Sequence, residues 1–199
     1  MADNQPYPVS LEAELDSHLS RWLWLVKWIL IIPHVIVLAI LWVVLVILTV
    51  AAFFAVLFTG RYPRGIFDYN VGVLRWTWRV SFYSYSALGT DRYPPFSLKD
   101  ADYPARLNIE YPERLSRGLV LVKWILGIPH FLVVGIFQGG EFGGLNSLLV
   151  LFSAIVLLFA ARYPTDIFHL VVGINRWSLR VAVYALLMRD EYPPFRLEP

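Results

Sequence analysis

Two long stretches that are almost free of charge constrain the fold of this chain most strongly. Residues 22–60 contain Lys27 as their only charged residue, and residues 118–161 contain only Lys123 and Glu141. A helix needs about 20 mostly apolar residues to cross a bilayer, and each stretch is roughly twice that length. The whole chain is 58% hydrophobic and 16% charged, whereas soluble domains are about 25% charged. We therefore expect lipid to be part of the solvent of this protein.

An internal repeat organises the chain. The motifs LVKWIL, IPH, RYP, RW and YPPF recur in the same order in the two halves of the chain, at offsets that begin at 96 residues. Self-similarity at a fixed spacing indicates repeated structural units. We predict a tandem duplication, with one membrane unit at residues 7–98 and a second at residues 103–197, related by a pseudo-twofold axis.

Each apolar block is expected to form a hairpin that crosses the membrane or inserts deeply into it. The second block contains the turn signal QGGEFGGLN, but the first has no break between Val35 and Phe58, so one long kinked crossing stays open there. The hairpin model leaves the basic residues on one side. By the positive-inside rule, this favours a multi-pass membrane protein with both termini in the cytoplasm. Pro33 and Pro129 bend the first helix of each block, so a shallow wedge is a further alternative.

An amphipathic helix is predicted after each RYP motif, over residues 65–88 and 166–187. At helical spacing its arginines share one stripe, which makes a position in the headgroup region cheaper than one in the hydrocarbon. One interpretation is binding of anionic lipid phosphate; the other is that the arginines pair with Asp68 or cap carbonyl groups inside the fold. The candidate headgroup-binding residues are Arg75, Arg79, Arg176, Arg180, Arg61 and Arg162.

Four polar residues lie inside the apolar blocks. Lys27 and Lys123 either extend along lipid to the interface or are buried against an acid such as Glu12 or Glu110. His34 and His130 follow the kinking prolines. They either hydrogen-bond carbonyl groups that proline frees, or each form half of a metal or proton site, and line a polar path with the two lysines, if the pseudo-twofold brings them together.

Few other features suggest chemistry. Short strands are expected at YPVSLEAEL and YPARLNIEY, tying the units together in a small cytoplasmic β-layer. The chain has no cysteine, no nucleotide-binding loop and no hydrolase or metalloprotease motif. We therefore expect no catalytic residues, no metal and no cofactor.

The repeated motifs resemble the DUF4389 family, bacterial membrane proteins that are frequent in actinobacteria. The resemblance covers almost the entire chain, once per unit, through LVKWIL, IPH, TGRYPRGIFDYNVGVLRWTWRV and DRYPPFSL. The second unit reads AARYPTDIFH where the first reads TGRYPRGIFD, so a role of Arg64 or Asp68 need not be duplicated. The resemblance implies a membrane location and a bacterial origin but no activity.

The sequence therefore predicts an all-α integral membrane protein with short strands and two repeats, each a helical hairpin plus an interfacial helix. The leading functional hypothesis is a non-enzymatic module that scaffolds partner proteins or organises anionic lipid. The alternative is a transporter or channel subunit with a polar path between the repeats. Anionic lipids, a protein partner or a second copy are the expected partners, and a net charge of +2 gives no reason to expect nucleic acid.

Overall fold

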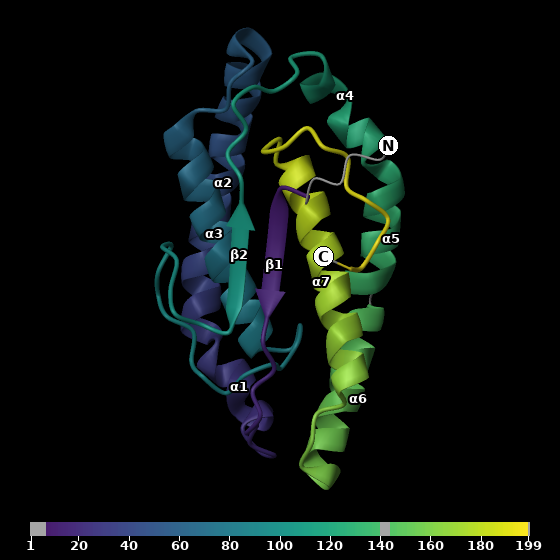
Figure 1. The fold of residues 1–199 in the computed structure, drawn as a ribbon. Coiled ribbons are helices and arrows are strands. Elements are labelled where there is room, and N and C mark those ends of the chain that lie inside the picture. The colour runs from purple at the N-terminus through teal and green to yellow at the C-terminus, as the bar shows by residue number, and fades with distance from the viewer. Residues whose placement is uncertain (1–6, 140–143, 199) are drawn as a thin grey trace.

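The computed structural model describes residues 7–139 and 144–198. The described chain is mostly helical and carries one small sheet (Figure 1). Its elements are β1 (Val9–Ala13), α1 (Trp24–Leu30), α2 (Ile32–Thr59), α3 (Arg64–Tyr83), β2 (Ala105–Ile109), α4 (Leu119–Leu126), α5 (Ile128–Gln138), α6 (Leu145–Ala160) and α7 (Thr165–Ala185).

The two strands pair antiparallel in the middle of the molecule. Leu11 lies opposite Leu107 at the centre of the pairing, and both side chains are buried. The neighbouring pair, Glu12 and Arg106, is exposed, because successive side chains of a strand point to opposite faces. The predicted short strands are confirmed, and they join the first half of the chain to the second.

The first apolar block does not form a hairpin. Pro33 lies at the start of α2 and separates it from α1, after which the helix continues for 28 residues. No glycine, proline or charged residue interrupts residues 34–59, so nothing stops the hydrogen-bond ladder. The chain reverses only at Gly60, whose φ of 70° is left-handed and suits glycine. The prediction of a hairpin in this block is wrong, and the long kinked helix is the correct alternative.

The second block does not reverse within itself either. α4 and α5 meet at an angle of 44° beside Pro129. Figure 1 shows α5 and α6 descending one after the other, with α7 returning beside them. The predicted hairpin is therefore wrong here as well: the Gly-rich signal interrupts a helical run instead of turning it. Residues 140–143, which include Glu141, lie outside the described residues.

Side-chain amides fasten the ends of this interruption. Gln138 Nε2 donates to Ser178 Oγ at 3.0 Å, and Asn146 Nδ2 donates to the carbonyl oxygen of Ser86 at 3.0 Å. Both amides lie in otherwise apolar helices, where an unsatisfied polar group is costly. These bonds hold the two ends of the break against α7 and against the turn after α3.

The amphipathic helices α3 and α7 lie in the interior. α3 packs between α2 and β2, and α7 packs against α5, α6 and β1. Their glycines permit close approach of the segments that follow the YPPF motifs. A Cβ atom on Gly72 would lie 2.8 Å from Leu98 Cβ, and one on Gly173 would lie 2.9 Å from Leu197 Cβ. The predicted helices therefore exist, but they form the core and not a layer of their own at a surface.

Candidate membrane-binding surface

Apolar helices cover one side of the molecule. α2 buries one face, through residues such as Leu45, Ala52 and Val56, and exposes the rest. Its side chains Ile47 and Phe58 are 62% and 72% exposed. By length and composition α2 could cross a membrane, α4 and α5 could do so as one bent pair, and α6 is apolar but shorter.

Charge is absent from the exposed surface of this side. Within the described residues, α1, α2, α4, α5 and α6 expose no charged side chain, because Lys27 and Lys123 point inward. Exposed apolar surface of this extent marks an interaction site. We call these five helices the apolar face.

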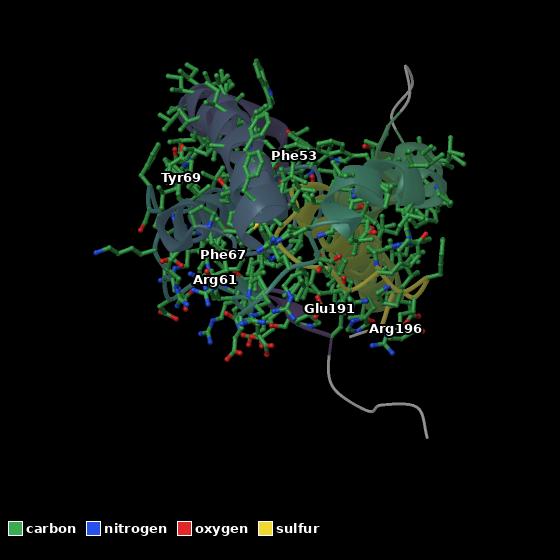
Figure 2. All side chains as sticks on the ribbon, turned by 90° about the horizontal axis from the view of Figure 1, so that it is seen from above. Phe53, Arg61, Phe67, Tyr69, Glu191 and Arg196 are labelled. Carbon is green, nitrogen blue, oxygen red and sulfur yellow. The ribbon has the colours of Figure 1, made fainter. Side chains whose placement is uncertain are left out.

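The opposite side carries the charges. Figure 2 shows oxygen and nitrogen atoms gathered on the side of Glu191 and Arg196, while side chains around Phe53 are almost all carbon. The exposed strand residues Glu12 and Arg106 belong to this charged side. The molecule therefore separates apolar from charged surface across its thickness.

The separation runs across the helix axes and not along them. Arg75, halfway along α3, donates from Nε to the carbonyl oxygen of Leu107 at 2.8 Å. Arg176, halfway along α7, donates from Nε to the carbonyl oxygen of Leu11 at 3.4 Å. The middle of the strand pair thus lies beside the middle of both helices, and its exposed charges lie there too.

The arginine stripes meet carbonyl groups of the chain itself. The side chains of Arg79 and Arg180 are buried, with 2% and 1% of the residue exposed. Arg79 donates to the carbonyl oxygens of Ser97 and Lys99, and Arg180 donates to that of Arg196. Arginine has five N–H donors and readily caps several carbonyl groups at once.

These contacts match the capping alternative of the sequence analysis. Asp68 pairs with Arg64 at 3.8 Å and not with Arg75. Arg75 and Arg176 are half-buried, whereas Arg61 and Arg162 are exposed. Among the six candidate headgroup residues, only the last two present freely accessible guanidinium groups.

Lys27 and Lys123 do not extend to the surface; each is 1% exposed. Lys27 Nζ lies 2.9 Å from Asp91 Oδ1 and donates to the carbonyl oxygen of Thr90 at 2.7 Å. Lys123 Nζ lies 2.7 Å from Asp190 and donates to the carbonyl oxygen of Arg189 at 2.7 Å. A buried charge needs such a partner.

The sequence analysis named Glu12 and Glu110 as possible acids, and these are not the partners. The signal that identifies the right ones is an aspartate two residues before YPPF in both halves, in DRYPPF and DEYPPF. Each aspartate also accepts a backbone N–H, from Ser20 and Ser116 respectively.

The two histidines lie in separate aromatic clusters. His34 Nδ1 accepts the indole N–H of Trp76 at 3.0 Å, and its ring stacks on Phe96 with centroids 3.9 Å apart. His130 makes the same contacts with Trp177, at 3.1 Å, and Phe195, at 4.0 Å. An Nδ1 atom that accepts a hydrogen bond belongs to a neutral imidazole that carries its proton on Nε2.

Within residues 7–139 and 144–198, the hydrogen bonds and ring contacts of His34 share no residue with those of His130, so the structure does not bring the two histidines together. The expected bond to a carbonyl group freed by proline is absent from the hydrogen bonds of both imidazoles in the described chain. Across residues 7–139 and 144–198, no group of three His, Cys, Asp or Glu side chains is arranged to hold a metal ion.

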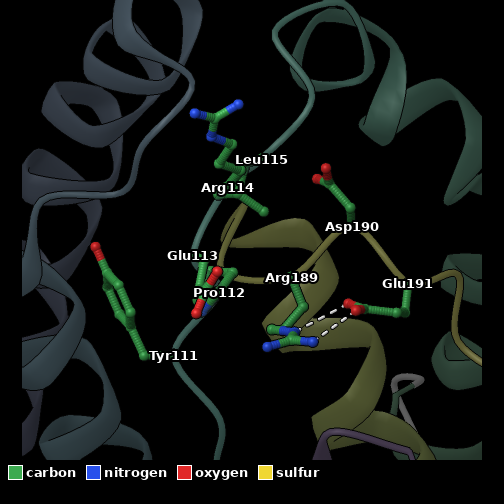
Figure 3. Close-up of a pocket in the computed structure, with 8 residues that line it drawn as sticks. All are labelled: Tyr111, Pro112, Glu113, Arg114, Leu115, Arg189, Asp190 and Glu191. Atoms are coloured by element: carbon green, nitrogen blue, oxygen red, sulfur yellow. Dashed lines mark hydrogen bonds and ion pairs between the residues drawn. The ribbon is translucent and has the colours of Figure 1, made fainter.

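A polar hollow on the charged side joins the segment after β2 to the segment before the second YPPF motif (Figure 3). Arg189 forms a two-bond pair with Glu191 there, with Nε 2.9 Å from Oε2, and donates to the carbonyl oxygen of Glu110 at 3.0 Å. Burial raises the pKa of Glu191, but the hydrogen bonds from Arg189 outweigh it and hold that pKa below its usual value. The guanidinium group of Arg189 therefore already has hydrogen-bond acceptors within the fold.

Comparison with known proteins gives one match. No curated protein and no solved structure matches the chain. Residues 21–97 match a family model described as a domain of unknown function, DUF4389. This segment runs from the start of the first apolar block through the first YPPF motif and includes Lys27, His34 and Arg79. Residues 21–97 are thus similar to the DUF4389 family, which the motifs repeated in both halves also resemble.

Proposed function

We propose that this protein is a non-enzymatic membrane module that lies in the plane of one leaflet. The apolar face enters the acyl region, and the strand pair faces water. The main support for this proposal is that the charged surface and the apolar surface lie on opposite sides of the helices, and not at opposite ends of them. A helix that binds in the interface buries its apolar face about 5–10 Å into the boundary between headgroups and acyl chains.

A crossing orientation is less favourable for the same geometry. If α2 stood along the bilayer normal, the strand pair would lie near mid-depth, because it packs beside the middle of α3 and α7. Glu12 and Arg106 would then be at the centre of the hydrocarbon, where a charged side chain costs about 2.5–3.5 kcal/mol on insertion scales. The outer edges of the two-stranded sheet would also lie there without water, where Arg75 and Arg176 supply donors to the carbonyl oxygens of Leu107 and Leu11.

Equivalent contacts in the two halves support a tandem duplication. Lys27 with Asp91 corresponds to Lys123 with Asp190, and the strand pairing is symmetric about the pair of Leu11 and Leu107. A twofold axis through that pair, perpendicular to the sheet, maps the apolar face onto itself. Both halves would then enter the same leaflet, which is what an in-plane module requires.

We further propose the cytoplasmic leaflet of a bacterial plasma membrane as the location. Cytoplasmic leaflets carry anionic lipids that attract basic residues near the surface. Exposed arginines occur in the turns that follow α2 and α6, through Arg61 and Arg162. The bacterial source rests on the family resemblance, and the leaflet rests on these basic turns.

Two fluorescent probes test the orientation relative to water. The chain has no native cysteine, so Ile47→Cys on α2 and Arg106→Cys on β2 each give one labelled site. In phosphatidylcholine vesicles with phosphatidylglycerol, we expect a bimane at position 47 to shift to shorter wavelength and to be quenched by lipid-borne nitroxides. A bimane at position 106 should be quenched by aqueous iodide.

Each alternative gives a different pattern. Iodide quenching at both positions would mean that the protein does not insert, and it would overturn the proposal. Protection of both positions from iodide would place the strand pair inside the bilayer or under a partner, which contradicts an in-plane module with a hydrated sheet.

A further inference from the structure

We infer that Arg61, Arg114 and Arg117 form a binding site for the phosphate group of an anionic phospholipid at the edge of the apolar face. The inference rests on the proposed function, and it names the ligand that a membrane-bound module would hold. Arg61 follows α2, whereas the other two arginines lie between β2 and α4, so both halves of the chain contribute to the site.

The three arginines surround one hollow. A cavity of about 450 Å³ is lined by Thr59, Gly60, Arg61, Arg114, Leu115 and Arg117. The N–H of Leu115 donates to the carbonyl oxygen of Gly60 at 2.9 Å, which ties the linker before α4 to the turn after α2. The left-handed Gly60 also lies close to this linker: a Cβ there would lie 3.3 Å from the carbonyl oxygen of Leu115 and in ordinary contact with Arg117 Nε, at 3.5 Å.

The site holds positive charge without a matching acid. Within the described residues, none of the three guanidinium groups lies within 4.0 Å of a carboxylate. In Figure 3 the Arg114 side chain points away from Glu113, Asp190 and Glu191. Like charges repel in such a cluster, and an anion that binds between them removes the repulsion. Arginine pairs with phosphate through two parallel N–H donors, which makes phosphate the fitting anion.

The location favours a lipid over a free phosphate ion. Phe58, 72% exposed on the last turn of α2, adjoins Thr59 and Gly60 of the cavity wall. Leu121, 53% exposed on α4, lies four residues beyond Arg117. A lipid whose phosphate binds between the arginines could thus pack its acyl chains against the exposed apolar side chains of α2 and α4. A free phosphate would use the arginines alone.

The equivalent positions in the other half offer a weaker site. By the repeat, His18, Arg21, Ala161 and Arg162 stand where the first site has Arg114, Arg117, Gly60 and Arg61. One arginine is replaced by histidine, and the turn lacks glycine. We therefore expect a single tightly held lipid for each chain.

Native mass spectrometry of the full chain in mild detergent tests the assignment, with phosphatidylglycerol added as the probe. We expect wild type to retain one phosphatidylglycerol and the Arg114→Gln/Arg117→Gln variant to retain less than a tenth as much. The Arg106→Gln/Arg196→Gln variant loses the same charge from positions that do not line the cavity and should match wild type. Circular dichroism establishes that each variant is folded.

Three outcomes would overturn the inference. They are equal retention by the Arg114→Gln/Arg117→Gln variant and wild type, equal loss in both double variants, and displacement of the bound lipid by millimolar inorganic phosphate. The last would assign the pocket to a free phosphate ion. The Ile47 probe separates this failure from failure of the proposed function, because insertion into pure phosphatidylcholine vesicles does not need the arginine site.

Discussion

At the scale of single residues, buried cations connect the apolar helices to the segments that follow α3 and α7. Lys27 reaches inward from α1 to the loop before the first YPPF motif, and Lys123 does the same from α4. The aromatic rings of Tyr83 and Tyr184 lie 4.5 Å and 5.2 Å from the two ammonium groups, which adds a cation–π contact to each. These contacts fix loops that are distant in sequence against helices of the apolar face.

Removal of the acid should leave the lysine charge buried without compensation. We predict that Asp91→Asn lowers the free energy of unfolding by about 3–5 kcal/mol, the cost of breaking a buried ion pair. Asp102→Asn is the matched control, because Asp102 is 86% exposed and its ion pairs with Arg92 and Arg106 span 3.5 Å and 3.9 Å. Denaturant titration in mild detergent measures both. Equal effects of the two substitutions would show that the ion pair of Lys27 does not support the fold.

Residue patterns predicted which polar side chains share a helix face, but they did not predict which groups these side chains contact. The helical spacing of Arg75, Arg79, Arg176 and Arg180 placed them on one stripe, as the structure has them. The carbonyl groups that they meet belong to extended segments about twenty residues further along, or to a strand of the other half. Helical periodicity holds no information on contacts of that range, so it could not separate capping from lipid binding.

At the scale of elements, the glycines of α3 and α7 set how closely the chain can pack. Gly72 faces Leu98 and Gly173 faces Leu197, so each amphipathic helix touches the end of a YPPF segment through a residue without a side chain. The contact brings the carbonyl groups of these segments within reach of Arg79 and Arg176.

Two glycines of the same helix should respond to alanine with opposite signs. Gly65→Ala meets nothing within 4 Å and should raise the free energy of unfolding by about 0.5–1 kcal/mol through helix propensity. Gly72→Ala would place its Cβ 2.9 Å from the carbonyl oxygen of Leu98, and we expect a loss of about 1–3 kcal/mol. Thermal unfolding of the two variants compares them directly. A gain of stability in Gly72→Ala would contradict the close packing.

Local sequence signals predicted where the helices and strands begin and end, but they did not predict where the chain reverses its direction. Proline at IPH predicted the breaks before α2 and α5, and period-two alternation predicted both strands. The sequence alone did not locate the reversal in the first apolar block. The composition of its 28 apolar residues is equally compatible with a hairpin and with one helix. A single left-handed residue, Gly60 or Ala161, makes the turn after each apolar run. In the sequence, the glycine-rich segment QGGEFGGLN was a stronger turn signal than Gly60 or Ala161. The structure instead has it between α5 and α6, two helices that run in the same direction.

At the scale of the whole molecule, the composition predicted contact with lipid but not the angle of that contact. A helix of 28 residues is about 42 Å long, more than the roughly 30 Å that a crossing needs. The angle depends on where the charged strand pair packs against the helices, and only tertiary structure provides that. In this fold the strands lie alongside the helices and not beyond their ends (Figure 1).

The depth profile of α2 in a bilayer tests the account most directly. Single cysteines at Ile36, Ile47 and Phe58, each exposed, carry a fluorophore whose quenching by nitroxides at known lipid depths gives the distance from the bilayer centre. An in-plane helix predicts the same depth at all three positions within a few ångströms. A crossing helix would place position 47 deepest and the other two about 16 Å nearer opposite surfaces, and that profile would contradict the account.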